Sequence, residues 1–453
     1  MPSDMNIVGV KLYLQGKLTE GGVSISDGKI AKIGKESTLP PSSKTLQGHR
    51  LLALPGLVDV HAHLRDLELS YKEDYFSGTS AAAAGGFTTL IDMPNTSPVT
   101  DSAERLREKM DIARRKIVVN VGFNIVPSNL EEVTKAKELA VGYKINLVKP
   151  WSDLSLDDST LASLINRAGL IGKMVIFHAE DGAMVSRLEN EFKENASIQS
   201  YYRAHPPEAE DVAVARVLGC TAEQTKIHFC HISSVGSLRL IKTAKQQRKK
   251  ITCEVTPHHL FLSRERASKW GGISIMDPPL RNREVAKRLF SALKKRAIDI
   301  VGTDHAPHSI GEKAQLPWWK IPPGIPGLET ALPLLLTEVK RGNISLKRVI
   351  EAMAETPAEI FGLNRGKLKE GNPADIILVD LNRRFKIDSS IFFSKAKYSP
   401  FDGRGVVGKI VKTFVGGKLV FDENRIVEAP GAGTILTPKN TWAKTCDVNV
   451  RLS

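Results

Sequence analysis

The chain of 453 residues carries two different patterns of apolar and polar positions. Between Leu57 and about Ile300, short β-branched apolar runs alternate with longer segments whose apolar residues recur at helical spacing. The strands are expected at Leu57–His61, Thr88–Asp92, Ile117–Phe123, Tyr143–Val148, Met174–His178, Ile227–His231, Ile251–Val255 and Ile298–Thr303. The helices between them are expected at Ala103–Arg115, Leu130–Leu139, Leu156–Ala168, Val212–Glu223, Ser237–Lys245 and Arg283–Lys294. Eight such alternations over about 250 residues are typical of a (β/α)8 barrel.

Both ends of the chain instead show short strands separated by turns. The expected strands are Asn6–Tyr13, Gly22–Ser26, Lys29–Ile33, Asp375–Val379, Val406–Val415 and Lys418–Phe421. The patterns therefore predict an α/β fold, with a (β/α)8 TIM barrel over residues 55–365 beside a small β-sandwich-like domain built from residues 1–54 and 366–430. Residues 431–453 form a tail with no clear pattern. The Gly/Pro-rich segment 309–326 follows the last predicted barrel strand, where we expect a loop that forms part of a substrate pocket.

Composition narrows the class of protein. The net charge is +14, but the basic clusters are short, lie in helix-like stretches and have no interleaved aromatic residues, so we expect solvated helix faces and no specific nucleic-acid site. No apolar run approaches the about 20 residues that span a bilayer, and the first residues do not resemble a signal peptide. The four scattered cysteines form no CxxC pair. A cytoplasmic protein with no membrane partner is expected.

Candidate metal ligands stand at the ends of separate predicted barrel strands. His61 and His63 are two positions apart at the end of the first strand, so their side chains point the same way. The further candidates are Lys144, His178, His231 and Asp304. Active sites of such barrels lie at the carboxyl ends of the strands, and imidazole and carboxylate ligands suit zinc. The set exceeds what one tetrahedral ion needs, which favours a site for two metal ions.

Four other histidines are weaker candidates for this site. They are His228, His258, His259 and His305. His228 lies three positions before His231 on the same predicted strand, so its side chain should point away from that of His231. We therefore expect His228 to have a structural role.

A series of short motifs, in this order, resembles the dihydroorotases, a branch of the cyclic amidohydrolases within the metal-dependent amidohydrolase superfamily. The motifs are HAHLRD from His61, SYKED from Ser70, AAGGFTT from Ala83, MPNT from Met93, HAE from His178, EVTPHH from Glu254, PPLR from Pro278, GTDHAPH from Gly302 and GIPGLET from Gly324. The likeness runs from about Val8 to Asp422.

The resemblance implies a cofactor that the residues alone do not show. In many relatives a lysine in the fourth barrel strand is carbamylated and bridges two Zn²⁺ ions. Lys144 is the expected equivalent, and Lys149 is the alternative. An unmodified ammonium group would repel zinc, whereas the carbamate carries a carboxylate that binds it.

The resemblance also implies the reaction, which is the reversible, zinc-dependent cyclisation of N-carbamoyl-L-aspartate to L-dihydroorotate and water, the third step of UMP biosynthesis. Asp304 would carry the proton, and Arg65 and Asn95 would hold the substrate carboxylate. His308 and the backbone around Pro322 and Gly324 would complete the pocket. The candidate partners are a second copy of the chain, in a homodimer, and an aspartate transcarbamoylase. The alternatives are an allantoinase or hydantoinase, and a noncatalytic scaffold.

Overall fold

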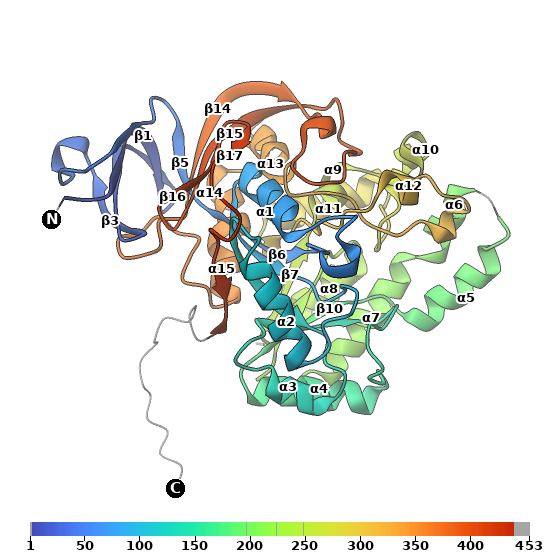
Figure 1. Ribbon diagram of the computed structural model, residues 1–453. Coiled ribbons are helices and arrows are strands. Elements are labelled where there is room, and N and C mark those ends of the chain that lie inside the picture. Colours follow the sequence, from blue (N-terminus) through green and yellow to red (C-terminus); the bar gives the residue numbers. More distant parts are fainter. Residues whose placement is uncertain (1, 196, 223, 248, 439–453) are drawn as a thin grey trace, which may run out of the picture.

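A barrel of parallel strands forms the larger part of the molecule (Figure 1). The computed structural model describes residues 2–195, 197–222, 224–247 and 249–438. The barrel strands follow one another in chain order and are β6 (Leu57–Ala62), β7 (Phe87–Asp92), β8 (Asn120–Ile125), β9 (Gly142–Asn146), β10 (Met174–His178), β11 (Lys226–Phe229), β12 (Ile251–Val255) and β13 (Ile300–Val301). The last strand returns to the first, because the backbone N–H of His63 donates to the carbonyl of His305 at 2.8 Å. The predicted (β/α)8 barrel is therefore confirmed.

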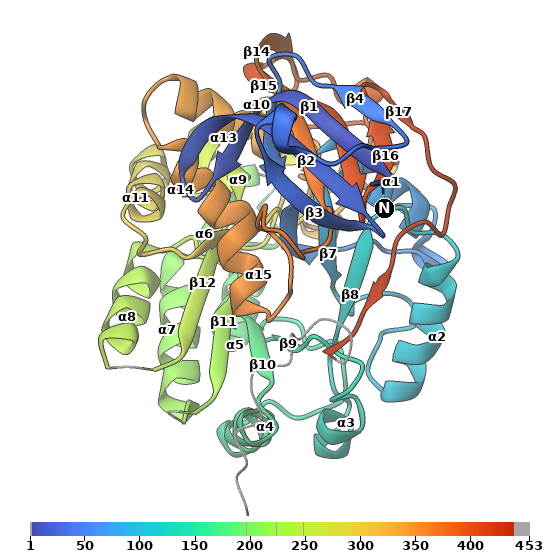
Figure 2. The same cartoon turned by 90° about the vertical axis from the view of Figure 1, so that its left-hand side faces the viewer.

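Helices cover the outside of this barrel (Figure 2). They include α1 (Tyr75–Ala84), α2 (Ala103–Arg114), α3 (Leu130–Lys135), α4 (Asp158–Leu170), α7 (Pro207–Cys220), α8 (Val235–Gln246) and α11 (Arg283–Lys294). Every residue of β6, β7 and β8 is buried. Strands covered on both faces read as continuous apolar runs, and this is why the sequence showed runs in place of alternation. A polar side chain in such a strand therefore marks a candidate functional position.

The two ends of the chain meet in a second sheet, at the left and top of Figure 1. Its strands run in the order β17 (Arg425–Ile426), β16 (Lys418–Asp422), β15 (Gly405–Val415), β14 (Ile376–Lys386), β5 (Leu52–Pro55), β1 (Met5–Leu14), β2 (Lys17–Ser26) and β3 (Lys29–Gly34), with β4 (Thr45–Gln47) beside β1. The antiparallel pairing of β5 with β14 joins the N-terminal and C-terminal halves. The expected small β-domain from both chain ends is thus present, and its described strands form one sheet in place of a sandwich.

Some elements were not expected from the sequence. The segment β18 (Ile435–Leu436) pairs in parallel with β8, and Figure 2 shows this red strand beside it. It lies in the tail where no pattern was visible, and residues 439–453 of that tail are outside the described part. Two helices, α5 (Gly182–Phe192) and α6 (Ile198–Ala204), follow β10 before the barrel helix α7. A two-residue strand gives no periodicity, so the sequence could not predict β18.

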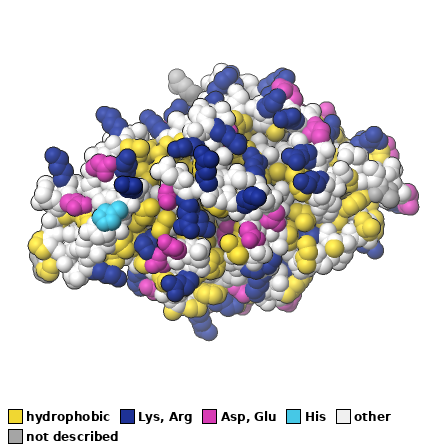
Figure 3. Space-filling model, turned by 90° about the horizontal axis from the view of Figure 1, so that it is seen from above, with side chains coloured by type: hydrophobic (Ala, Val, Ile, Leu, Met, Phe, Trp, Pro, Cys, Tyr) yellow, Lys and Arg dark blue, Asp and Glu magenta, His cyan; other side chains and the backbone are white. Residues whose placement is uncertain are grey.

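Charged side chains of both signs share the face of the molecule that is seen from above. Seen from above, Lys and Arg side chains are distributed over the face among Asp and Glu side chains (Figure 3). Within the described residues, no helix combines the length and the apolar character that crossing a bilayer requires. The Gly/Pro-rich segment after β13 contains the short helix α12 (Ile310–Lys313) and reaches back to the mouth of the barrel.

Candidate active site

The carboxyl ends of the barrel strands surround a cavity of about 230 Å³. All six predicted metal ligands line it, and each is nearly buried; they are His61, His63, Lys144, His178, His231 and Asp304. They come from β6, β9 and β10 and from the turns that follow β6, β11 and β13. Residues more than 240 positions apart therefore face one small space, as the barrel topology predicted.

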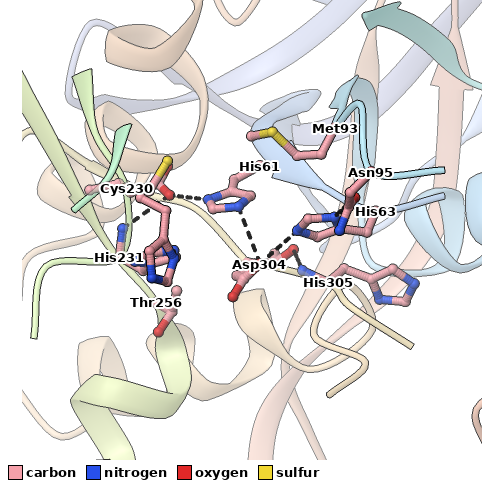
Figure 4. A network of polar contacts seen from close by, with 12 residues as sticks. His61, His63, Met93, Asn95, Cys230, His231, Thr256, Asp304 and His305 are labelled. Carbon is pink, nitrogen blue, oxygen red and sulfur yellow. Dashed lines mark hydrogen bonds and ion pairs between the residues drawn. The ribbon is translucent and has the colours of Figure 1, made fainter. Parts of the chain in front are cut away.

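One carboxylate links the two histidines of the first strand. Oδ1 of Asp304 lies 3.2 Å from Nε2 of His61 and 3.1 Å from Nε2 of His63, and Figure 4 shows the three side chains pointing toward one another. Nδ1 of His178 lies 3.1 Å from Nε2 of His231. One ligand atom each from His61, His231 and Asp304 falls within 4.8 Å of the others. Such a set of imidazole nitrogens and a carboxylate oxygen fits a zinc-like ion.

A second layer of acceptors orients these histidines. The ring of His61 bonds through Nδ1 to Glu254, a fully buried carboxylate in β12 that also accepts the backbone N–H of His231 at 3.2 Å. Nε2 of His178 lies 2.8 Å from Glu180. Such partners fix the imidazole tautomer, so that the other nitrogen presents a lone pair to a metal. Sequence reasoning missed the role of Glu254, although a carboxylate inside an apolar strand was a usable signal.

His63 receives the same kind of support from Asn95. Its Nδ1 bonds to Oδ1 of Asn95 while its Nε2 faces Asp304. Asn95 also lines the cavity, and Oδ1 of its amide accepts this bond. Asn95 thus connects the candidate metal ligands to the opposite wall.

The electrostatics of the ligand cluster favour a bound cation. Burial opposes the ionisation of Asp304, but His61 and His63 hold its pKa well below the ordinary value. Burial also opposes the protonation of His61, yet Cys230, Glu254 and Asp304 together hold its pKa well above the ordinary value. In contrast, burial lowers the pKa of His63 to about 4. A cluster that attracts positive charge onto a buried imidazole has the charge balance of a cation site.

Backbone strain is concentrated at the same place. His231 and Asp304 have φ angles of 30° and 46°, and Arg65 has a φ angle of 58°. Non-glycine residues rarely adopt this left-handed region, and such strain gathers at functional sites. The turns after β6, β11 and β13 therefore hold their side chains in the cavity at an energetic cost that the packed barrel must offset.

Lys144 and Lys149 have different environments. Lys144 is 1% exposed and its Nζ lies 2.9 Å from Sγ of Cys230, next to His61. Lys149 also lines the cavity but is exposed, and its Nζ is 3.9 Å from Glu189 at the rim. Of the two lysines, Lys144 is the one beside the candidate ligands.

The wall opposite the ligand cluster carries positive charge. Arg65 is only 5% exposed, yet within the described chain its guanidinium makes no ion pair with a carboxylate. Asp66, a neighbour that could have paired with it, pairs with Lys116. The Nε–H of Arg65 donates to the Pro307 carbonyl at 3.3 Å, and Nη2 lies 3.1 Å from His308. A buried guanidinium that forms no ion pair points to an anionic ligand.

The loop after β13 completes this wall. His308, Pro323 and Gly324 line the cavity, and Nε2 of His308 lies 3.0 Å from the Pro323 carbonyl. The carbonyl of Pro322 instead accepts a hydrogen bond from the buried Lys313. The structure therefore brings Gly324 and the neighbouring Pro323 to the cavity, whereas Pro322 does not line it.

The four weaker histidine candidates do not line the cavity. His228 bonds to Thr252 and Glu254, as its expected structural role requires. His259 bonds to Thr256 and to the Pro278 carbonyl. His258 is buried beside it, and His305 accepts the backbone N–H of Gly327 at 3.1 Å.

The fold and this site define a class of barrel enzymes. The chain belongs to the amidohydrolase family, because the pattern of that family matches residues 52–420. It is 37% identical over 412 residues to a dihydroorotase of Methanothermobacter thermautotrophicus, covering 90% of this chain and 93% of that protein. It is 38% identical to a dihydroorotase of Bacillus cytotoxicus, covering 92% and 97%.

Solved structures of relatives carry the same fold. The L-hydantoinase (dihydropyrimidinase) from Arthrobacter aurescens superposes with a TM-score of 0.92 and is 30% identical, with 96% of this chain and 100% of that chain covered. The dihydropyrimidinase from Brevibacillus agri superposes with a TM-score of 0.89 at 26% identity, over 97% and 99% of the two chains. The predicted membership of the cyclic amidohydrolases is thus confirmed.

Proposed function

We propose that this chain is a dihydroorotase, a hydrolase of cyclic amides that interconverts N-carbamoyl-L-aspartate and L-dihydroorotate. The observation that carries the proposal is the buried, carboxylate-free guanidinium of Arg65, which faces the candidate metal ligands across one cavity. A substrate that carries a carboxylate beside its reacting amide would satisfy both walls at once. The dihydroorotases of M. thermautotrophicus and B. cytotoxicus, similar over at least 90% of the chain, support the same reaction.

We further propose that the cofactor is zinc, with two ions per subunit held by His61, His63, Lys144, His178, His231 and Asp304. The buried position of Lys144 among these residues supports its carbamylation, because an ammonium group there would oppose a cation. When bound, the ions would supply an activated water at neutral pH and polarise the ring carbonyl.

The protein groups would divide the remaining tasks between the two walls. Arg65, Asn95 and His308 would hold the substrate carboxylate and so fix the ring amide beside the ligand cluster. Asp304, held ionised by its two histidine neighbours, would accept a proton during ring opening and return it to the leaving ring nitrogen. In ring closure the same carboxylate would remove a proton from the ureido nitrogen. The reaction would be the third step of UMP synthesis, in the cytoplasm.

A hydantoinase activity is the second candidate, because the solved relatives include an L-hydantoinase with a TM-score of 0.92. Hydantoin itself carries no carboxylate, so it would leave the charge of Arg65 unmatched. The deciding experiment is to assay purified, zinc-supplemented protein with L-dihydroorotate, hydantoin and allantoin side by side. We expect turnover of dihydroorotate alone. Turnover of an uncharged ring with none of dihydroorotate would contradict the proposal, and inactivity on all three would favour a scaffold.

A further inference from the structure

His308 has more hydrogen-bond neighbours than one neutral imidazole can satisfy. Its Nε2 lies 3.0 Å from the Pro323 carbonyl and 3.1 Å from Nη2 of Arg65. Its Nδ1 lies 3.2 Å from Nζ of Lys72. Burial, with Arg65, Lys313 and Lys72 nearby, holds the pKa of His308 well below the ordinary value, so the ring is neutral and carries one N–H.

The position of that single hydrogen follows from these three neighbours, since the carboxylate of Glu312 lies 3.9 Å from Nδ1 of His308, beyond hydrogen-bond distance. Lysine and arginine can only donate, and a carbonyl can only accept. With the hydrogen on Nε2, the ring accepts from Lys72 and donates to Pro323, and the contact with Arg65 is unfavourable. With the hydrogen on Nδ1, only the bond from Arg65 is favourable, while Lys72 and Pro323 both oppose it. Two satisfied contacts against one favour the Nε2–H tautomer, and Lys72 supplies the deciding one.

The Nε2–H tautomer makes a donor pair. Nε2 of His308 and Nη2 of Arg65 then both carry hydrogens at 3.1 Å separation, so they cannot bond to each other. An anionic oxygen beside them would accept from Nη2 of Arg65 and would share the single Nε2–H with the Pro323 carbonyl. With the hydrogen on Nδ1, the imidazole would instead present a lone pair at this position and repel a carboxylate.

We propose that Lys72 is a positioning residue of the anion-binding wall, which fixes the Nε2–H tautomer of His308 and so directs a second donor beside Arg65 at the substrate carboxylate. The carboxylate substrate rests on the function proposed above, whereas the tautomer does not. Lys72 does not line the cavity, so it would act on the substrate through His308. It lies in the loop between β6 and α1, and His308 follows β13, so the closure of the barrel brings them together.

A purely structural role for Lys72 is the competing explanation, because its Nζ also lies 2.7 Å from Glu312 in α12. Glu312 caps that helix through Ser309, and a glutamine can make the same cap. Glu312→Gln therefore removes the charge of the ion pair while it keeps the helix start. It is the matched control for Lys72→Met, which removes the donor to His308.

The first test reads the tautomer without any substrate. Protein labelled with ¹⁵N-histidine is compared by NMR as wild type and as Lys72→Met, with His308 assigned from the resonance lost in His308→Gln. We expect the hydrogen on Nε2 in the wild type and a mixture of both tautomers in Lys72→Met. A hydrogen on Nδ1 in the wild type, or an unchanged tautomer in Lys72→Met, would overturn the proposal.

The second test reads the consequence for the substrate. Lys72→Met should raise the KM for N-carbamoyl-L-aspartate about tenfold and change kcat by less than about threefold, since the lost interaction is one of binding. Lys72→Arg should restore most of the affinity, and Glu312→Gln should leave KM near the wild-type value. An equal rise in KM in Lys72→Met and Glu312→Gln would assign the effect to the ion pair and overturn the proposal. If the wild type does not turn over this substrate, the proposed function fails and the NMR test still decides the role of Lys72.

Discussion

The two walls of the barrel cavity favour ligands of opposite charge. On one wall, His61 is drawn toward protonation between Glu254 and Asp304, so the cluster favours a cation. On the other, Arg65 and Lys72 converge on a neutral His308, and the guanidinium has no carboxylate partner in the described chain. Folded proteins rarely leave buried charge uncompensated. The comparison indicates that each wall is completed by a ligand of opposite sign, a metal ion on one side and an anion on the other.

The largest effect is expected on the cation-seeking wall, which carries the candidate metal ligands. Asp304→Asn keeps the size of the side chain but cannot accept a proton, so we expect kcat to fall by at least about 10³-fold with the fold intact. Steady-state kinetics with dihydroorotate, together with thermal melting of both proteins, measure this. Turnover at the wild-type rate in the folded variant would exclude Asp304 as the proton carrier.

The second largest effect is expected on the anion-seeking wall, which carries Arg65 and His308, and it should leave metal binding unchanged. Arg65→Ala removes charge-assisted hydrogen bonds to the carboxylate, so we expect the KM for N-carbamoyl-L-aspartate to rise about 100-fold while the zinc content stays at the wild-type level. Arg105→Ala, at an exposed ion pair with Asp101, is the control and should leave KM unaltered. An unchanged KM in Arg65→Ala would argue against the carboxylate clamp.

A smaller effect is expected behind the metal ligands. Glu254→Gln leaves an acceptor for His61 but removes the negative charge, and we expect zinc affinity to fall about 10- to 100-fold. Competition with a chromophoric chelator measures the affinity. Glu338→Gln, which alters a buried carboxylate bound to Arg341 and Asn343 far from the cavity, should bind zinc like the wild type. Equal zinc affinity in all three proteins would show that Glu254 does not support metal binding.

The smallest effect concerns stability and pH. Lys313 is 2% exposed, and burial lowers its pKa to about 7 from 10.5. Between these values the unfolded chain binds more protons than the folded one, so Lys313 makes stability rise with pH. Its contribution is full above about pH 10.5 and is lost as the pH falls through about 7. The stability of the wild type relative to Lys313→Met should therefore increase from pH 7 to 10.

Urea unfolding of both proteins across this range measures the difference. Lys294→Met, at an exposed lysine of α11, controls for the loss of a charge. A difference between wild type and Lys313→Met that does not change with pH would show that Lys313 is charged in the folded state throughout.

The barrel and the ligand set could be predicted from the sequence because they rest on local signals. Except for Lys144, which lies inside its strand, each candidate ligand ends or directly follows an apolar run, and strands of a parallel barrel all present their carboxyl ends at one face. Lys72 carried no such signal, since its importance comes from a contact with His308 in a distant segment. Glu254 was visible as a carboxylate inside an apolar strand, but its role depends on a contact with His61 that the sequence does not show. The assignment of Pro322 shows the same limit, because the cavity is lined by the next residue, Pro323.

By itself the sequence determined the alternation of barrel strands and helices, the joining of both chain ends in one small domain, and the residue types that gather at the barrel mouth. These follow from hydrophobic periodicity and from the position of polar residues at strand ends, which are properties of short segments. Only the tertiary structure decided that Arg65 has no carboxylate partner, that Lys144 is buried and Lys149 exposed, and which nitrogen of His308 carries its hydrogen. Charge compensation, burial and tautomer depend on distances between segments that the closure of the barrel brings together.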